Sequence, residues 1–232
     1  TGKHTVAIET GIGNKLPPKL NEIYGAQQQL PRAFEAAQIR PEDIDIVINS
    51  HLHFDHCGWN TTRTPDGAIV PTFLNARYFA HRGEVTHGRL QLERDAISYI
   101  SDNYDPLIAS GQMTLLDTEP GETTLVVPGI SVECFPGHTA QLLAVHIDAD
   151  TNNPGCQRAT YISDLIPTSA HLDITWVMGY DLDPVTCIAE RKRFYSRAIP
   201  EKWLVLFTHD HHTPFARIEL NEKGKPVIAK SV

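Results

Sequence analysis

The sequence has neither a long hydrophobic run nor an excess of positive charge. No segment approaches the roughly 18 consecutive apolar residues that suggest a membrane span. Lys and Arg total 20 against 28 Asp and Glu, so the formal net charge is -8. Nucleic-acid-binding proteins usually carry a basic face. We therefore expect no membrane partner, no nucleic-acid partner, and a small, neutral or modestly polar substrate.

Cysteine is also scarce, and its spacing excludes two common roles. The four cysteines include no C-x-x-C pair, which supports neither a disulfide framework nor a zinc ribbon. Free thiols fit a reducing compartment, so we expect a cytoplasmic location. No signal peptide is visible, but Thr1 leads almost directly into the apolar run Val6-Ala7-Ile8, which indicates a truncated N-terminus. The cysteines are Cys57, Cys134, Cys156 and Cys187.

The chain also lacks internal repeats, low-complexity tracts and long linkers, so residues 1–232 are expected to form a single domain. Apolar periodicity and turn residues predict an α/β protein of mixed strands and helices. Residues 59–88 contain Pro65, Gly67 and Pro71 and are expected to be irregular. The expected helices are 28–38, 90–100 and 184–198, and the expected strands are 5–9, 44–48, 113–116, 123–127, 130–135, 142–148, 159–163, 203–207, 215–220 and 227–229.

A cluster of metal-ligand side chains follows the predicted strand 44–48. His51, His53, Asp55 and His56 lie within six residues of one another. Imidazole nitrogen and carboxylate oxygen are good ligands for zinc and its first-row neighbours. On a turn rather than a strand, these groups can point in different directions and bind two adjacent ions. Placing four desolvated polar groups together without a metal would be costly.

Three further candidate ligands share the same position at the end of an apolar strand. His138 follows 130–135, Asp164 follows 159–163 and His209 follows 203–207. Ligands collect where the strands of an open α/β sheet end, which groups these residues with the first cluster. His211 and His212 lie beside His209 and compete with it, or face solvent. Isolated histidines such as His4, His81 and His146 are more often surface or core residues.

Taken together, these segments resemble the metallo-β-lactamase superfamily. His51-Leu52-His53-Phe54-Asp55-His56-Cys57-Gly58 matches its signature, and Val6 to Gly11 resembles its early strand and Asp-Thr-Gly turn, with Glu9 in place of Asp. Pro136-Gly137-His138-Thr139, Ser163-Asp164 and Thr208-His209-Asp210 resemble its later ligand motifs. The resemblance implies an αβ/βα sandwich of two mixed β-sheets flanked by helices. It also implies that one metal is bound by His51, His53 and His138, the other by Asp55, His56 and His209, with Asp164 bridging.

Within the superfamily, the chain is most similar to the lactonase and methyl parathion hydrolase branch. The segments Pro71 to Ala76 and Trp176 to Asp181 carry this likeness. It implies a hydrolase that uses a metal-bridging hydroxide to open lactones or cleave esters, with possible activity on phosphotriesters, and a homodimer. The best-known N-acyl homoserine lactonases have a catalytic Tyr three residues after the bridging Asp. Pro167 stands there in this chain, which puts their tyrosine-assisted mechanism in doubt.

The roles of individual residues follow from this resemblance and from general chemistry. Asp55 is the expected catalytic residue, orienting the nucleophile and passing its proton to the leaving group. The metals are expected to be zinc, with Mn, Co, Fe and Ni as alternatives. Cys57 is either a small buried residue or a neighbour of the metals. The candidate substrate-binding residues, each equally compatible with core packing, are Trp59, Phe73, Trp176, Met178 and Tyr180.

Other functions remain as alternatives. A β-lactamase would turn over nitrocefin, and a mononuclear iron dioxygenase of the same superfamily would bind iron and consume oxygen. A metal-stabilised binding domain would have no activity. Retention of all seven apparent ligands argues against that last alternative.

Overall fold

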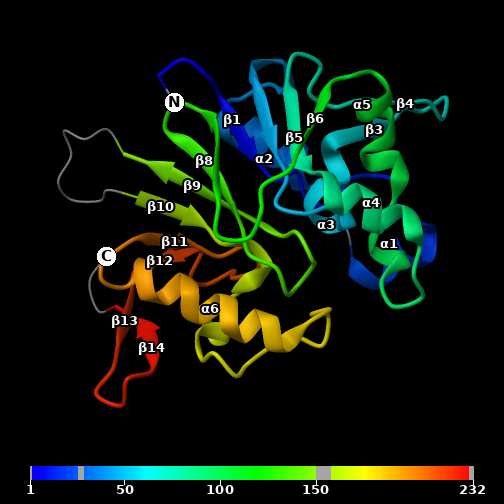
Figure 1. Cartoon of the computed structure of the whole chain (residues 1–232). Helices are drawn as coiled ribbons and strands as arrows, with labels where there is room; N and C mark the ends of the chain where they lie inside the picture. Colours follow the sequence, from blue (N-terminus) through cyan, green and yellow to red (C-terminus); the bar gives the residue numbers. More distant parts are fainter. Residues whose placement is uncertain (1, 26–28, 150–157, 230–232) are drawn as a thin grey trace. The chain divides into compact units, whose positions relative to one another are not determined.

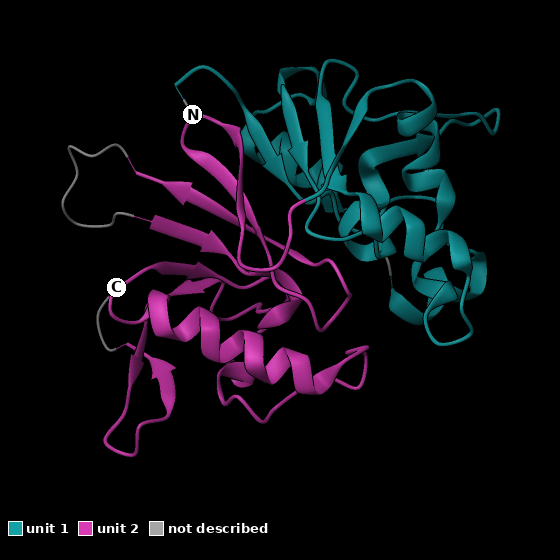
Figure 2. Ribbon diagram, in the orientation of Figure 1, with its two compact units in different colours: residues 1–117 teal, residues 118–232 magenta. Residues whose placement is uncertain are grey.

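The computed structural model describes residues 2–25, 29–149 and 158–229, which divide into two compact units, Thr1–Asp117 and Thr118–Val232 (Figure 2). Each unit has its own sheet and its own hydrophobic core. Cys156 and the expected helix start at Gln28 lie outside the described residues. No helix in the described ranges combines the length and hydropathy that crossing a membrane requires.

Unit 1 is built on a parallel sheet with the strand order β1-β2-β5-β6 (Figure 1). Its strands are β1 (Val6–Ile8), β2 (Ile46–Ile48), β5 (Arg77–His81) and β6 (Met113–Leu116). Every residue of β2 is buried, as expected for a central parallel strand covered on both faces. The histidine cluster therefore follows directly after a strand in the interior of unit 1.

Helices and a small hairpin complete unit 1. Its core contains Val47, Leu52, Phe73 and Tyr78, with Phe34 of α2 packed against it. The hairpin pairs β3 (Thr61–Arg63) with β4 (Ile69–Pro71). The helices are α1 (Pro18–Tyr24), α2 (Gln29–Ala37), α3 (Phe54–Cys57), α4 (Arg82–Leu90) and α5 (Asp105–Ala109), with 3-10 turns η1 (Pro41–Asp43), η2 (Gly58–Asn60), η3 (Ala96–Ser98) and η4 (Ser101–Asn103).

Unit 2 is built on a sheet with the order β12-β11-β10-β9-β8-β7. Strand β9 is antiparallel to both β8 and β10, and β10 is parallel to β11. The carboxyl ends of β8, β10 and β11 therefore lie at the same edge. The strands are β7 (Thr123–Val127), β8 (Ile130–Cys134), β9 (Leu143–Asp148), β10 (Arg158–Tyr161), β11 (Leu204–Leu206) and β12 (Phe215–Ala216). The other elements are η5 (Ser163–Leu165), η6 (Ser169–Leu172), α6 (Pro184–Ala198) and the hairpin β13 (Ile218–Leu220) and β14 (Pro226–Ile228).

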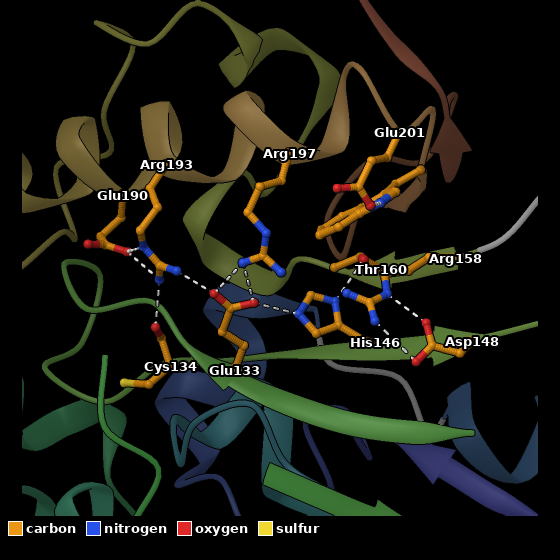
Figure 3. Close-up of polar contacts among 11 residues, drawn as sticks. Glu133, Cys134, His146, Asp148, Arg158, Thr160, Glu190, Arg193, Arg197 and Glu201 are labelled. Carbon is orange, nitrogen blue, oxygen red and sulfur yellow. Dashed lines mark hydrogen bonds and ion pairs between the residues drawn. The ribbon is translucent and has the colours of Figure 1, made fainter. Parts of the chain in front are cut away.

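A buried ionic network fastens α6 to this sheet (Figure 3). Glu133 of β8 is fully buried and accepts hydrogen bonds from Arg193 and Arg197 of α6. Its Oε2 also lies 2.9 Å from Nε2 of His146, and Trp203 packs edge-on against that imidazole. Burial alone would raise the pKa of Glu133, but these hydrogen bonds and the nearby guanidinium of Arg197 lower it to about 2. The carboxylate is therefore ionised across the neutral range.

Several predicted elements match the structure, and three differ. Strands 113–116 and 123–127 and helix 184–198 have the predicted bounds. Residues 59–88 are not irregular, because they contain β3, β4, β5 and most of α4. The helix expected at 90–100 is wrong, because Gln91 adopts the left-handed conformation that ends α4. The strand expected at 215–220 is divided between two sheets. Two mixed sheets were expected, but the sheet of unit 1 is parallel throughout.

Candidate metal centre

In unit 1, the histidine cluster lies where β2 gives way to the one-turn helix α3. His53 has extended backbone angles and precedes that helix, so the direction of the chain changes within the motif. The centroid of the His51 ring lies 4.5 Å from that of His53 and 4.0 Å from that of His56. All three imidazoles are buried, whereas the side chain of Asp55 is 29% exposed. The turn therefore directs three imidazoles toward one another and leaves one carboxylate accessible.

The loop after β1 holds the end of this motif in place. Gly58 N–H donates to Gly11 O at 2.7 Å, and Lys15 Nζ donates to Gly58 O at 2.5 Å. A Cβ at residue 58 would lie 1.9 Å from Ile12 O. A larger residue would therefore push the motif away from the loop, which explains glycine at this position.

Two imidazoles of unit 1 have their Nδ1 atoms engaged by neighbouring polar groups. His51 Nδ1 lies 2.9 Å from Ser50 Oγ, and His56 Nδ1 lies 3.4 Å from Glu9 Oε2. The second oxygen of Glu9 accepts from Ser50 N–H at 2.7 Å. Such contacts orient an imidazole and direct its Nε2 toward a metal. Glu9 adopts a left-handed backbone (φ 64°), a strained conformation that functional sites often contain.

In unit 2, the carboxylate of Asp164 lies between two histidines. Its Oδ2 is 3.4 Å from His138 Nε2, and its Oδ1 is 3.3 Å from His209 Nε2. These residues follow β8, β10 and β11, whose carboxyl ends share one edge of the sheet. The far side of the His138 ring is held by Asp181, whose Oδ1 lies 3.0 Å from Nδ1. One oxygen thus faces each histidine, which suits a carboxylate that bridges two cations.

These distances and donor types fit metal ions. Two ligands bound at about 2.0–2.1 Å to one tetrahedral zinc are separated by about 3.3 Å. The contacts of Asp164 in unit 2 match this separation, and Asp55 Oδ2 lies 3.5 Å from His56 Nε2 in unit 1. Nitrogen and oxygen donors of this kind suit zinc and its first-row neighbours. The side chains of each unit therefore have the donor types and spacing that a metal ion requires.

Sequence reasoning found the ligand candidates but missed the groups that orient them. From the sequence, Glu9 is only a departure from the superfamily pattern and Asp181 only part of a similar segment, and neither has an expected role. Both contacts join residues far apart in the sequence, so local spacing carries no signal for them. The assignment of all seven candidate ligands to one centre remains a prediction.

The candidate substrate-binding residues lie in different environments. Trp59 and Phe73 are buried in unit 1, and Phe73 packs against Phe34 and Tyr78 in the core. Trp176 and Tyr180 of unit 2 are 60% and 76% exposed. Met178 is partly buried. Trp176 lines a cavity of about 450 Å³ whose wall includes Leu172 and β14. Contact of these residues with a substrate remains a prediction.

The cysteine and the remaining histidines that the sequence singles out have side-chain contacts with residues other than the candidate metal ligands, or are exposed. Cys57 is fully buried, its Sγ donates to Leu52 O at 3.4 Å, and burial raises the pKa of its thiol. It therefore fits the expectation of a small buried residue. His146 belongs to the ionic network of unit 2, and His81 accepts from Gly83 N–H at the start of α4. His211 and His212 are exposed and pack edge to face.

Comparison with known proteins shows similarity to metal-dependent hydrolases. The metallo-β-lactamase superfamily model matches residues 1–62, which include the histidine motif. A probable metal-dependent hydrolase from Staphylococcus aureus superposes over 100% of this chain and 80% of its own, with a TM-score of 0.82 and 24% identity. Residues 1–62 are thus similar to the metallo-β-lactamase superfamily, and the likeness to the hydrolase structure is one of fold. The chain's mixed α/β elements and multiple sheets flanked by helices are those of the metallo-β-lactamase fold.

Two further similar proteins are described as lactonases. An N-acyl homoserine lactonase from a Bacillus species is 26% identical over 203 residues, covering 87% of this chain and 68% of the relative. The structure of AidC, described as a dizinc quorum-quenching lactonase in complex with a product, N-hexnoyl-L-homoserine, has a TM-score of 0.76. It is 18% identical and covers 100% of this chain and 78% of its own. The second likeness is one of fold.

Proposed function

We propose that this protein is a dinuclear metal-dependent hydrolase that opens lactones or cleaves esters. The observation that carries the proposal is the Asp164 carboxylate, which presents one oxygen to His138 and the other to His209. The oriented imidazoles of unit 1 and the lactonase named among the relatives support it. Phosphotriesters are proposed as secondary substrates, and the active form is proposed to be a homodimer of single-domain chains.

The proposal assigns the donors of both units to one pair of cations, most simply zinc. The first cation would be held by His51, His53 and His138. The second would be held by Asp55, His56 and His209, with Asp164 shared between them.

When bound, the cations would lower the pKa of a water molecule and polarise the carbonyl oxygen of the substrate, whose carbon is attacked. The residues of the chain would do the rest. Glu9 and Asp181 would hold the Nδ1 sides of His56 and His138 so that their Nε2 atoms face the ligand site. The partly exposed carboxylate of Asp55 would accept the proton of the attacking water and deliver it to the departing alkoxide. In this proposal Asp55 would act without the tyrosine that the best-known N-acyl homoserine lactonases have at the position of Pro167.

Replacing Asp55 with Asn tests the role of this carboxylate. Asn cannot accept the proton, so we expect kcat for γ- and δ-lactones and aryl esters to fall by about 10²–10⁴-fold. Asp117→Asn is the matched control, because Asp117 forms an exposed ion pair with Arg82. Undiminished turnover by Asp55→Asn would contradict the assignment.

The substrate panel also separates the proposal from its alternatives. The panel should also include paraoxon and nitrocefin, and oxygen consumption should be measured alongside it. Nitrocefin turnover without lactone turnover would indicate a β-lactamase. Bound iron with oxygen uptake and no hydrolysis would indicate a dioxygenase.

A further inference from the structure

Glu84 is a fully buried carboxylate in unit 1 that the proposed chemistry does not use. It lies in the first turn of α4, and its Oε2 accepts two hydrogen bonds. One comes from Leu52 N–H at 3.2 Å and the other from the Tyr99 hydroxyl at 3.0 Å. Leu52 lies between His51 and His53 in the sequence, so this carboxylate is hydrogen-bonded to the backbone of the candidate metal-binding turn.

The surroundings of Glu84 argue against a role in stability alone. No Lys, Arg or His forms an ion pair with it in the described part of the chain, and its Oε1 is buried without a hydrogen-bond partner there. Burying a carboxylate without full compensation is costly, and an apolar side chain would often stabilise such a position better. The N-terminus of α4 offsets part of this cost. The presence of a carboxylate at this buried position points to a functional reason.

Tyr99 connects Glu84 to the candidate ligand His53. Its ring packs edge-on against the imidazole of His53, with centroids 5.0 Å apart and planes at 77°. A Cβ at Gly88 would lie 2.5 Å from Cδ1 of Tyr99, so α4 holds the tyrosine closely from another side. The burial and the adjacent Glu84 carboxylate raise the pKa of Tyr99, which keeps its hydroxyl protonated as a donor.

We infer that Glu84 is a positioning residue for metal binding, because it fixes the His51–His53 turn through the Leu52 amide and the His53 ring through Tyr99. The inference rests on the metal centre of the proposed function and concerns residues of unit 1. Both hydrogen bonds end on the same oxygen, Oε2. The carbonyl oxygen of a glutamine in that place can accept both bonds, since it has two lone pairs.

The test compares Glu84→Ala with Glu84→Gln. Each is loaded with Zn²⁺ or Co²⁺ in the absence of substrate, and affinity is measured by chelator competition. We expect Glu84→Ala to bind metal about 10–100-fold more weakly and to change the Co²⁺ absorption spectrum, as loss of outer-shell partners does elsewhere. Glu84→Gln should stay close to wild type in both. Hydrogen exchange at the Leu52 amide should accelerate in the alanine variant and not in the glutamine variant.

Glu133→Gln is the matched control for losing a buried carboxylate. Glu133 is equally buried, and its contacts lie in the ionic network of unit 2. We expect this variant to lose stability and keep metal affinity. If Glu84→Ala fails to fold, Tyr99→Phe provides a second variant. It removes one of the two hydrogen-bond donors to Glu84 and keeps the aromatic ring against His53. The Leu52 amide should stay protected from hydrogen exchange in Tyr99→Phe.

Two results would overturn the inference. The first is wild-type metal affinity and spectrum in folded Glu84→Ala. The second is equal loss of affinity in Glu84→Gln and Glu84→Ala, since this would assign the effect to charge rather than to the two hydrogen bonds. A wild-type chain that binds no metal would overturn the proposed centre before any variant is made. A chain whose metal affinity depends on Glu84 as described, but which hydrolyses no member of the panel, would contradict only the proposed hydrolase activity.

Discussion

At the scale of single residues, the candidate centre depends on groups that hold the imidazoles from behind. Ser50, Glu9 and Asp181 each engage an Nδ1 atom. Ser50 and Asp181 lie at hydrogen-bond distance, and Glu9 Oε2 lies 3.4 Å from its imidazole. A histidine ligand has two ring nitrogens, and a polar neighbour at one favours the other for metal. The orientation of these imidazoles in each unit therefore depends on residues that are not candidate ligands.

Asp181→Asn tests this dependence at His138. The carboxylate of Asp181 is buried, contacts His138 Nδ1 and accepts from Met178 N–H at 2.9 Å. An amide there binds the imidazole less strongly, so we expect metal affinity to fall about 10–100-fold in a chelator competition. Asp183→Asn is the control, because Asp183 caps α6 and Asn caps helices equally well. Equal affinities for the two variants would contradict this role.

At the scale of elements, the packing of the β1 loop on the histidine motif has little tolerance. A methyl group at Gly58 would meet the backbone of Ile12, which cannot move like a flexible side chain. We expect Gly58→Ala to lower the free energy of unfolding by about 2–3 kcal/mol, measured by urea denaturation. Gly179→Ala is the control, since a Cβ there meets no heavy atom within 4 Å. A Gly58→Ala variant as stable as the control would contradict the close contact.

The attachment of α6 to its sheet should depend on pH through Glu133. The pKa of this carboxyl is lowered from 4.5 to about 2 in the folded protein, so its contribution is present above about pH 4.5 and is lost as the pH falls toward 2. We expect the metal-free wild type to be about 2–3 kcal/mol more stable than Glu133→Gln at pH 7. Denaturation curves from pH 7 to 3 should show this difference shrinking. A constant difference would contradict the low pKa.

The elements that sequence patterns predicted well are those with clear local signals. Pro184 opens α6 at a position that suits proline, and Asp183 caps it. Helix 90–100 failed because its apolar spacing continued past Gln91, where the backbone turns left-handed without glycine to mark it. Strands β3, β4 and β5 were missed because Pro65, Gly67 and Pro71 suggested irregular structure, whereas residues 65 and 67 lie between the strands of a hairpin.

At the scale of the whole molecule, the sequence motifs resemble those of the metallo-β-lactamase superfamily, and the candidate ligands could be named because they follow predicted strands. The partners Glu9, Glu84 and Asp181 could not be predicted, because their contacts depend on packing between distant segments. Their residue types are also ordinary at the surface, and only burial marks them as unusual. Burial is a property of the fold rather than of local spacing.

The sharing of ligands among two cations gives a prediction for the whole chain. If Asp164 bridges, Asp164→Ala should lower the content of both metals, whereas His53→Ala should lower mainly one. Elemental analysis of the purified variants measures this directly. Equal retention of both metals by Asp164→Ala would contradict a bridging role.

The most direct test of the central claim is the metal content of the wild-type protein, with turnover measured on the same sample. The account predicts about two divalent ions per chain, and lactone or ester hydrolysis that is lost on chelation and restored by added metal. One ion or none, together with no hydrolysis of any member of the panel, would contradict it.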